Sequence, residues 1–233
     1  MLARTLAFAL LVVTFGVALA SHPGSQSLYE ILGFTADGKY VHFKKTNVAP
    51  PHASHWHAVY DIATAKSKTS QPVYRDCGGV QCYEGAEIDK KTGERTTAQL
   101  TKTYGAPVAA SLVPMTTKID KDAAIVAVKK AAGYTQVFAG PGVEVKTTSK
   151  LLGTLADLSD GNSKSVQVEV EVAVTASSAK WTTKHKLYAD SVVDLHNGNI
   201  LLWPELYVQQ LAVAPDRKAI ALVFARKPYV IKP

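Results

Sequence analysis

The chain has 233 residues, 47% of them hydrophobic, and its 26 Lys and Arg residues against 19 Asp and Glu residues give a formal net charge of +7. A chain of this length buries enough apolar surface to fold without a disulfide framework or a structural metal. Its basic residues are dispersed rather than gathered in blocks, which argues against a nucleic-acid-binding protein and leaves only a general affinity for anionic envelope surfaces.

The first 20 residues have the three parts of a secretory signal peptide. Arg4 supplies a positive start, residues 6–19 form an apolar run, and Ala18-Leu19-Ala20 gives the small-residue pattern of a cleavage site. The apolar run of about 14 residues is shorter than the ~20 residues of a permanent membrane helix. We therefore expect removal of residues 1–20, a single β-rich globular domain at residues 21–233 with no membrane span, and a secreted or periplasmic location.

Alternation of apolar and polar residues, typical of strands with one buried face, begins soon after this segment. It predicts strands at Leu28–Thr35, Lys39–Lys45 and His55–Ile62. Asp37-Gly38 favours a tight turn between the first two strands. Only a short connection separates the second strand from the third, so these segments predict an antiparallel meander.

The two cysteines, Cys77 and Cys82, enclose four residues in the sequence Cys-Gly-Gly-Val-Gln-Cys. Export to an oxidising compartment favours their pairing, and Gly78-Gly79 suits the tight loop that the bond would close. The spacing differs from the two-residue spacing of thioredoxin-like redox pairs. We therefore expect a structural disulfide between Cys77 and Cys82.

Two segments in the middle of the chain have helical patterns. Lys121–Ala132 is the clearer one, with Asp120 as its N-cap and Gly133 at its end. A weaker pattern covers Glu94–Tyr104, and residues 140–160 show little pattern of any kind.

The C-terminal half returns to alternation. Strands are predicted at Val166–Thr175, Lys186–Leu195, Ile200–Trp203, Tyr207–Ala214 and Lys218–Ala225. Turn residues such as Pro215-Asp216 indicate hairpins between them. The sequence therefore predicts an α+β fold of mainly antiparallel sheet, built from hairpins and meanders, with one or two helices.

Two distant segments share the order strand, Asp-containing turn, Lys, strand: residues 32–41, Leu-Gly-Phe-Thr-Ala-Asp-Gly-Lys-Tyr-Val, and residues 211–220. Each resembles the hairpin of propeller blades of the periplasmic TolB type. The first, with the Tyr60-Asp61-Ile62 strand, is also similar to a family of predicted secreted bacterial proteins of unknown function. The resemblance implies no activity. It makes a partial or irregular β-propeller the alternative fold, although a propeller needs four or more blades at a regular period.

Sequence patterns of common active sites are missing, including the nucleophile elbow, the His-Glu-x-x-His zinc motif and phosphate-binding glycine loops. Ser177 to Lys180 matches Ser-x-x-Lys, but it falls between two predicted strands instead of opening a helix. Glu169 and Glu171 share one face of a strand whose other face is valine, which is typical of a solvated sheet face. We therefore predict no catalytic residue.

Histidines are the only potentially functional side chains that cluster along the sequence. Four of the seven lie close together: His42, His52, His55 and His57. Imidazole is the commonest metal ligand in proteins. The hypothesis from this spacing is a zinc or copper site formed by these residues, with His52 contributed from a loop. The alternative interpretation is a set of surface histidines on a polar loop and strand.

The strand register supports a shared face for three of these histidines. Matching the apolar faces of residues 39–45 and 55–62 requires paired residue numbers that sum to an odd value, for example Phe43 opposite Trp56. His42, His55 and His57 then lie on one solvent-facing side, with His42 opposite or diagonal to His57. Asp61 lies on the same side, where it is expected to hydrogen-bond a ring nitrogen.

Two functions are compatible with these features. The first is an exported soluble, non-catalytic module that binds a protein, a small molecule or an envelope surface, and the lack of an assembled catalytic motif favours it. The alternative is a metal-binding protein or metal-dependent hydrolase that uses the His42/His55/His57 cluster.

Overall fold

The computed structural model describes residues 26–49, 52–79, 85–109, 111–117, 133–152, 165–176, 179–190, 208–224 and 227–233. The predicted signal peptide, the predicted helix Lys121–Ala132 and the predicted strand Ile200–Trp203 lie outside these stretches.

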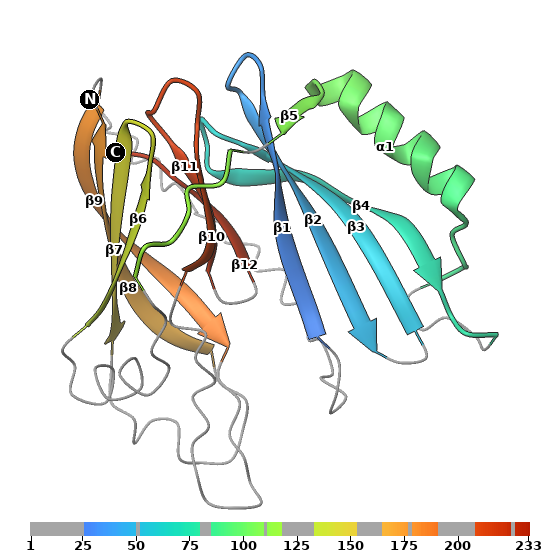
Figure 1. Ribbon diagram of the computed structural model, residues 1–233. Coiled ribbons are helices and arrows are strands. Elements are labelled where there is room, and N and C mark those ends of the chain that lie inside the picture. Colours follow the sequence, from blue (N-terminus) through green and yellow to red (C-terminus); the bar gives the residue numbers. More distant parts are fainter. Residues whose placement is uncertain are drawn as a thin grey trace, which may run out of the picture.

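Three antiparallel sheets make up most of the described chain (Figure 1). Their strand orders are β4-β3-β2-β1-β5, β10-β11-β12 and β6-β7-β8-β9. The strands are β1 (Gln26–Thr35), β2 (Tyr40–Ala49), β3 (His52–Asp61), β4 (Lys66–Asp76), β5 (Pro107–Ala109), β6 (Tyr134–Gly140), β7 (Val143–Leu152), β8 (Ser165–Ala176), β9 (Ala179–Asp190), β10 (Val208–Val213), β11 (Ile220–Phe224) and β12 (Lys227–Ile231). With the helix α1 (Lys90–Tyr104), they confirm the predicted α+β fold of mainly antiparallel sheet. The described strands form open sheets and not a ring of four-stranded propeller blades.

The three-stranded sheet lies between the other two (Figure 1) and is buried on both faces. Along β11, Ile220, Leu222 and Phe224 pack toward the four-stranded sheet. The intervening Ala221 and Val223 pack toward the five-stranded sheet. This alternation of large and small side chains lets one strand serve two cores, because successive residues of a strand point to opposite faces.

Two glutamine side chains, buried Gln136 and half-buried Gln210, also join the sheets. The Gln136 side chain of β6 accepts a hydrogen bond from the Val208 amide at 2.7 Å and donates one to the Val208 carbonyl at 3.1 Å. The Ile31 amide of β1 donates to Oε1 of Gln210 at 3.0 Å. These bonds give partners to backbone groups at strand edges, which would otherwise be costly to bury.

Helix α1 covers the face of the five-stranded sheet that is turned away from the three-stranded sheet (Figure 1). Asp89 is its N-cap and accepts a hydrogen bond from the Thr92 amide at 2.7 Å, so the helix begins four residues before the predicted Glu94–Tyr104. Gly93 allows the close approach, since a Cβ at this position would lie 1.7 Å from the Val73 carbonyl oxygen of β4. The described stretches contain no helix long and apolar enough to cross a membrane.

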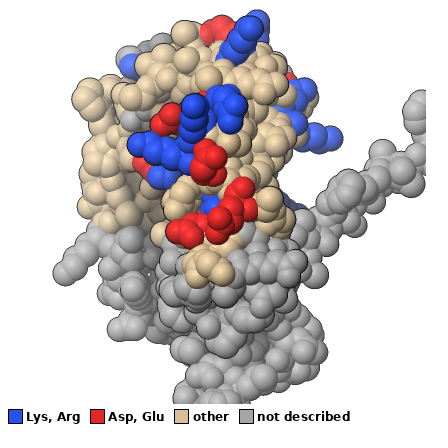
Figure 2. Space-filling model, turned by 90° about the vertical axis from the view of Figure 1, so that its right-hand side faces the viewer, with Lys and Arg blue, Asp and Glu red and all other residues tan. Residues whose placement is uncertain are grey.

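The outer surface of α1 is polar and carries charges of both signs. Figure 2 looks onto the side of the molecule that carries α1 and shows basic and acidic side chains interspersed there. Lys90, Lys91, Glu94, Arg95 and Lys102 are all exposed positions of this helix. The mixture gives no single-sign field for attracting a polyanion.

The two segments with similar sequences are both hairpins and have the same turn. In β1–β2, Oδ1 of Asp37 accepts from the Lys39 amide at 3.1 Å, and in β10–β11, Oδ1 of Asp216 accepts from the Lys218 amide at 3.0 Å. The residue after each Asp has a positive φ, 67° at Gly38 and 58° at Arg217. A side-chain oxygen that bonds the backbone two residues on is the usual device of such turns.

Several strands differ from the sequence prediction. β4, β5, β6 and β12 were not predicted, and the patternless residues 140–160 contain β7. β7 lacks an apolar alternation because its buried positions include Thr147 and Ser149. β9 begins at Ala179, earlier than the predicted Lys186, because it pairs with β8 along its whole length.

Cys77 follows β4 and is 1% exposed. Gly78 and Gly79 have φ values of 59° and 81°, which fit the predicted tight loop. Cys82 lies outside the described stretches. The Cys77–Cys82 disulfide therefore stays a prediction.

Candidate functional site

The register of β2 and β3 places the histidines. Phe43 pairs with Ala58, two residues from the predicted Trp56, so the odd sum of paired numbers holds. His42 pairs with Val59 and Lys44 pairs with His57, which makes His42 and His57 diagonal neighbours on one face. The prediction that His42, His55 and His57 share a face is confirmed.

The prediction that this face is open to solvent is wrong for two of the three. His42 is 0% exposed and His57 is 4% exposed. The reason is helix α1, whose Thr97 and Thr101 line the same pocket as His57. The helix that buries this face begins only at Lys90, whereas β3 ends at Asp61, so the pattern within β2 and β3 does not reveal it.

The two buried imidazoles are hydrogen-bonded to each other. Nδ1 of His42 lies 2.8 Å from Nε2 of His57, and the rings meet edge to face at a centroid distance of 5.0 Å. Such a bond requires one nitrogen to carry the proton and the other to accept it. Nε2 of His42 is buried and has no hydrogen-bond partner.

The surroundings favour the neutral form of both rings. Burial, and secondarily the neighbouring His57, lowers the pKa of His42 from 6.5 to about 4. Burial also lowers the pKa of His57. At neutral pH both rings are therefore uncharged, because a charged imidazolium would lose its hydration here. One N–H proton lies in the hydrogen bond between them.

His55 has partners of its own. Its Nδ1 lies 3.0 Å from Oγ1 of Thr46, and its ring packs against Tyr74 at a centroid distance of 5.3 Å. Asp61 bonds none of the histidines whose side chains the structure describes, contrary to the prediction: its carboxylate accepts from the Thr64 amide at 2.9 Å and pairs with Lys68 at 3.3 Å.

Within the described residues, no group of three or more His, Cys, Asp or Glu side chains is arranged to hold a metal ion. The structure thus brings His42 and His57 together and gives His55 separate partners. The side chain of His52 is outside the description. The hypothesis of a His42/His52/His55/His57 zinc or copper site is therefore untested as a whole.

A pocket of about 420 Å³ lies between α1 and the sheet, above the buried pair. Its apolar wall comes from Leu32, Val73, Pro107 and Ala109, with Trp56 at its border, and its polar groups are Lys44, His57, Thr97 and Thr101. Lys44 is 44% exposed at its side chain, and its Nζ lies 3.9 Å from the Glu30 carboxylate. A mainly apolar lining that includes a few polar residues is the usual composition of a small-molecule site.

The pocket was not predicted from the sequence. The Asp89 N-cap followed by Gly93 is the only local sign of a helix docked closely on the sheet. Neither residue indicates which strands the helix covers.

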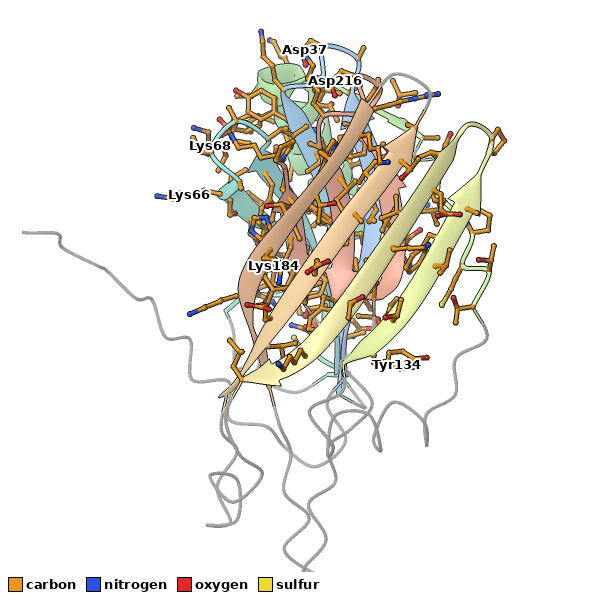
Figure 3. The ribbon with its side chains drawn as sticks, turned by 90° about the vertical axis from the view of Figure 1, so that its left-hand side faces the viewer. Asp37, Lys66, Lys68, Tyr134, Lys184 and Asp216 are labelled. Carbon is orange, nitrogen blue, oxygen red and sulfur yellow. The ribbon has the colours of Figure 1, made fainter. Side chains whose placement is uncertain are left out.

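Glu169 and Glu171 of β8 lie on a solvated sheet face, as the sequence predicts. Lys184 of β9, labelled in Figure 3, pairs across the four-stranded sheet with Glu171 at 3.0 Å and with Glu169 at 3.8 Å. The hydrogen bond and charge of Glu171, and secondarily the charge of Glu169, raise the pKa of Lys184. Exposed pairs of this kind contribute little to stability.

Comparison of the chain with protein-family models, with curated proteins and with solved structures found no match.

Proposed function

We propose that the protein is an exported, non-catalytic binding module that takes its ligand in the pocket beneath α1. One observation carries this proposal: the pocket of about 420 Å³, whose mainly apolar lining includes His57 and Lys44. Its export is inferred from the signal-like sequence of residues 1–20.

The lining suggests the class of ligand. Side chains of Leu32, Val73 and Pro107 favour an apolar body, and the neutral His57 with the hydroxyls of Thr97 and Thr101 offers hydrogen bonds at a few points. Lys44 adds a positive charge at a partly exposed position. The ligand that fits best is a small, mainly apolar molecule with one polar group.

A filled-pocket variant tests the proposal. The uncharged dye N-phenylnaphthylamine is titrated into the protein, and its fluorescence should rise saturably. Thr97→Phe, which places a ring in the pocket, should abolish this rise. Ala98→Phe adds the same ring at the adjacent exposed helix position and should leave it unchanged. Equal binding by both variants, or no saturable binding by the parent protein, contradicts the proposal.

A metal-binding function is the second candidate, and the 2.8 Å approach of His42 and His57 favours it. Two nitrogens that each lie about 2 Å from a zinc ion are roughly 3 Å apart, so a small separation of the rings accommodates a metal. Calorimetry with zinc and copper tests this candidate. It requires affinity tighter than about 100 μM that is lost in His42→Ala and His57→Ala but kept in His185→Ala.

A further inference from the structure

Arg75 of β4 is a buried guanidinium without an acidic partner among the described residues. The residue is 8% exposed, and its Nε is buried with no hydrogen-bond partner. Its Nη1 donates to the Ala86 carbonyl at 3.2 Å. None of the ion pairs formed within the described stretches involves it.

The neighbours of Arg75 are also hydrogen-bond donors. Its guanidinium carbon lies 5.8 Å from the centre of the Trp56 ring, and Nζ of Lys45 lies 5.8 Å from the same centre. The indole Nε1 of Trp56, which can only donate, is buried without a partner. The contact between Arg75 and Trp56 therefore contains a buried positive charge and two N–H groups without a hydrogen-bond partner.

The loop after β4 holds the guanidinium in place. The Arg75 amide and carbonyl both bond to the backbone of Ile88 at 3.1 Å, so Ile88 lies beside the strand as an antiparallel bridge partner. A Cβ at Gly85 would lie 2.9 Å from Nη1, and Gly85 has a φ of 112° that other residues rarely adopt. The fork of Arg75 is thus oriented by backbone on one side and by the Trp56 ring on the other.

Burying an unpaired charge is costly, and an unsatisfied donor adds to the cost. A bound oxyanion removes both penalties, because a guanidinium fork matches the paired oxygens of a carboxylate, phosphate or sulfate. We propose that Arg75 and Trp56 form a binding site for an oxyanion group, on the face of the sheet opposite to the His42–His57 pair.

This site is separate from the proposed function. Paired residues of a sheet share a face, so Trp56 and Lys45 lie opposite to His57 and Lys44, which form the next pair along β2 and β3. Although Trp56 borders the pocket beneath α1, Arg75 and Lys45 are not part of its lining.

Calorimetry of the parent protein with phosphate, sulfate and acetate, at constant ionic strength with chloride as the background, tests the site. We expect saturable binding of at least one oxyanion, with one ion per chain. Arg75→Gln should weaken it roughly tenfold or more, as expected for loss of a charge-assisted bond. The control Arg95→Gln removes an exposed arginine of α1 and should leave it unchanged. The three anions distinguish a tetrahedral from a planar ligand group.

If Arg75→Gln does not fold, Trp56→Phe, which removes the indole N–H, and the thermal midpoint of the parent protein supply the test. The midpoint should rise with the bound oxyanion at constant ionic strength, and Trp56→Phe should reduce this rise. No saturable binding by the parent protein, or equal binding by the parent and Arg75→Gln, overturns the proposal. Because N-phenylnaphthylamine is uncharged, its binding in Arg75→Gln separates failure of this site from failure of the pocket beneath α1.

Discussion

His42 and His57 are 15 residues apart in the chain, and their imidazoles share a hydrogen bond of 2.8 Å between Nδ1 and Nε2. Helix α1 buries the pair, and His57 forms part of the pocket that lies above it. Pairing, burial and pocket together distinguish this face of the five-stranded sheet from the charged outer face of the four-stranded sheet.

Acid should destabilise the fold through this pair. In the unfolded chain a histidine takes up a proton near its ordinary pKa of 6.5, whereas native His42 does so only near 4. Between these two pKa values the unfolded state binds more protons than the native state. The contribution of His42 to the free energy of unfolding is therefore fully present above pH 6.5 and falls as the pH drops toward 4. The loss from His42 is at most about 3 kcal/mol.

Urea unfolding at pH 7.5 and at pH 5 measures this effect. The double variant His42→Gln/His57→Gln should show much less change between the two pH values. Carboxylates with lowered pKa values, such as Asp37 and Asp61, lose their contribution only at lower pH, near and below 3.8. An equal acid loss in the parent and the double variant contradicts the assignment.

Gly93→Ala should destabilise the protein, although alanine is the better helix former by about 1 kcal/mol. The added methyl would meet the Val73 carbonyl oxygen at 1.7 Å, so the helix must move away from the sheet. Overpacking of this kind costs about 1–3 kcal/mol or more. Urea unfolding should therefore show a lower midpoint, whereas Gln99→Ala, at an exposed position of the same helix, should be neutral or slightly stabilising. A stabilised Gly93→Ala variant would mean that α1 does not dock as described.

The two similar hairpin turns should respond unequally to loss of the aspartate. Asp37 accepts from the Lys39 amide and also from the Thr35 hydroxyl at 2.6 Å, whereas Asp216 is described with the Lys218 amide alone. Asp37→Ala should lower the thermal midpoint by a few degrees and Asp216→Ala by less. Asp37→Asn keeps an acceptor oxygen and should fall between Asp37→Ala and the parent. A larger effect at Asp216 contradicts this ranking.

How far the sequence predicts this structure depends on which residues face the cores. β8 was predicted because Val168, Val170, Val172 and Val174 all face inward. β7 was missed because the buried side chains at Thr147 and Ser149 are polar and break the alternation. The start of α1 was not predicted because its first turn contains Thr92 and Gly93, which are poor helix formers, and close packing on β4 offsets that weakness.

The candidate site was predictable only within one hairpin. The matching apolar faces of β2 and β3 fix whether His42 and His57 share a side, and that prediction held. Burial of the pair depends on α1, and the orientation of the Arg75 side chain depends on the segment that bonds it at Ala86 and pairs with its backbone at Ile88. The local sequence pattern predicts neither contact, because each joins separate segments of the chain.

The imidazole resonances of His42 and His57 test the central claim most directly. Nitrogen–proton NMR spectra of the labelled protein at pH 7 should show two neutral rings that share one N–H, and the His57 signals should move saturably as N-phenylnaphthylamine is added. The His185 signals, from the four-stranded sheet, should stay in place. Two independent histidines that titrate near pH 6.5 and do not respond to the dye would contradict both the buried pair and the ligand pocket above it.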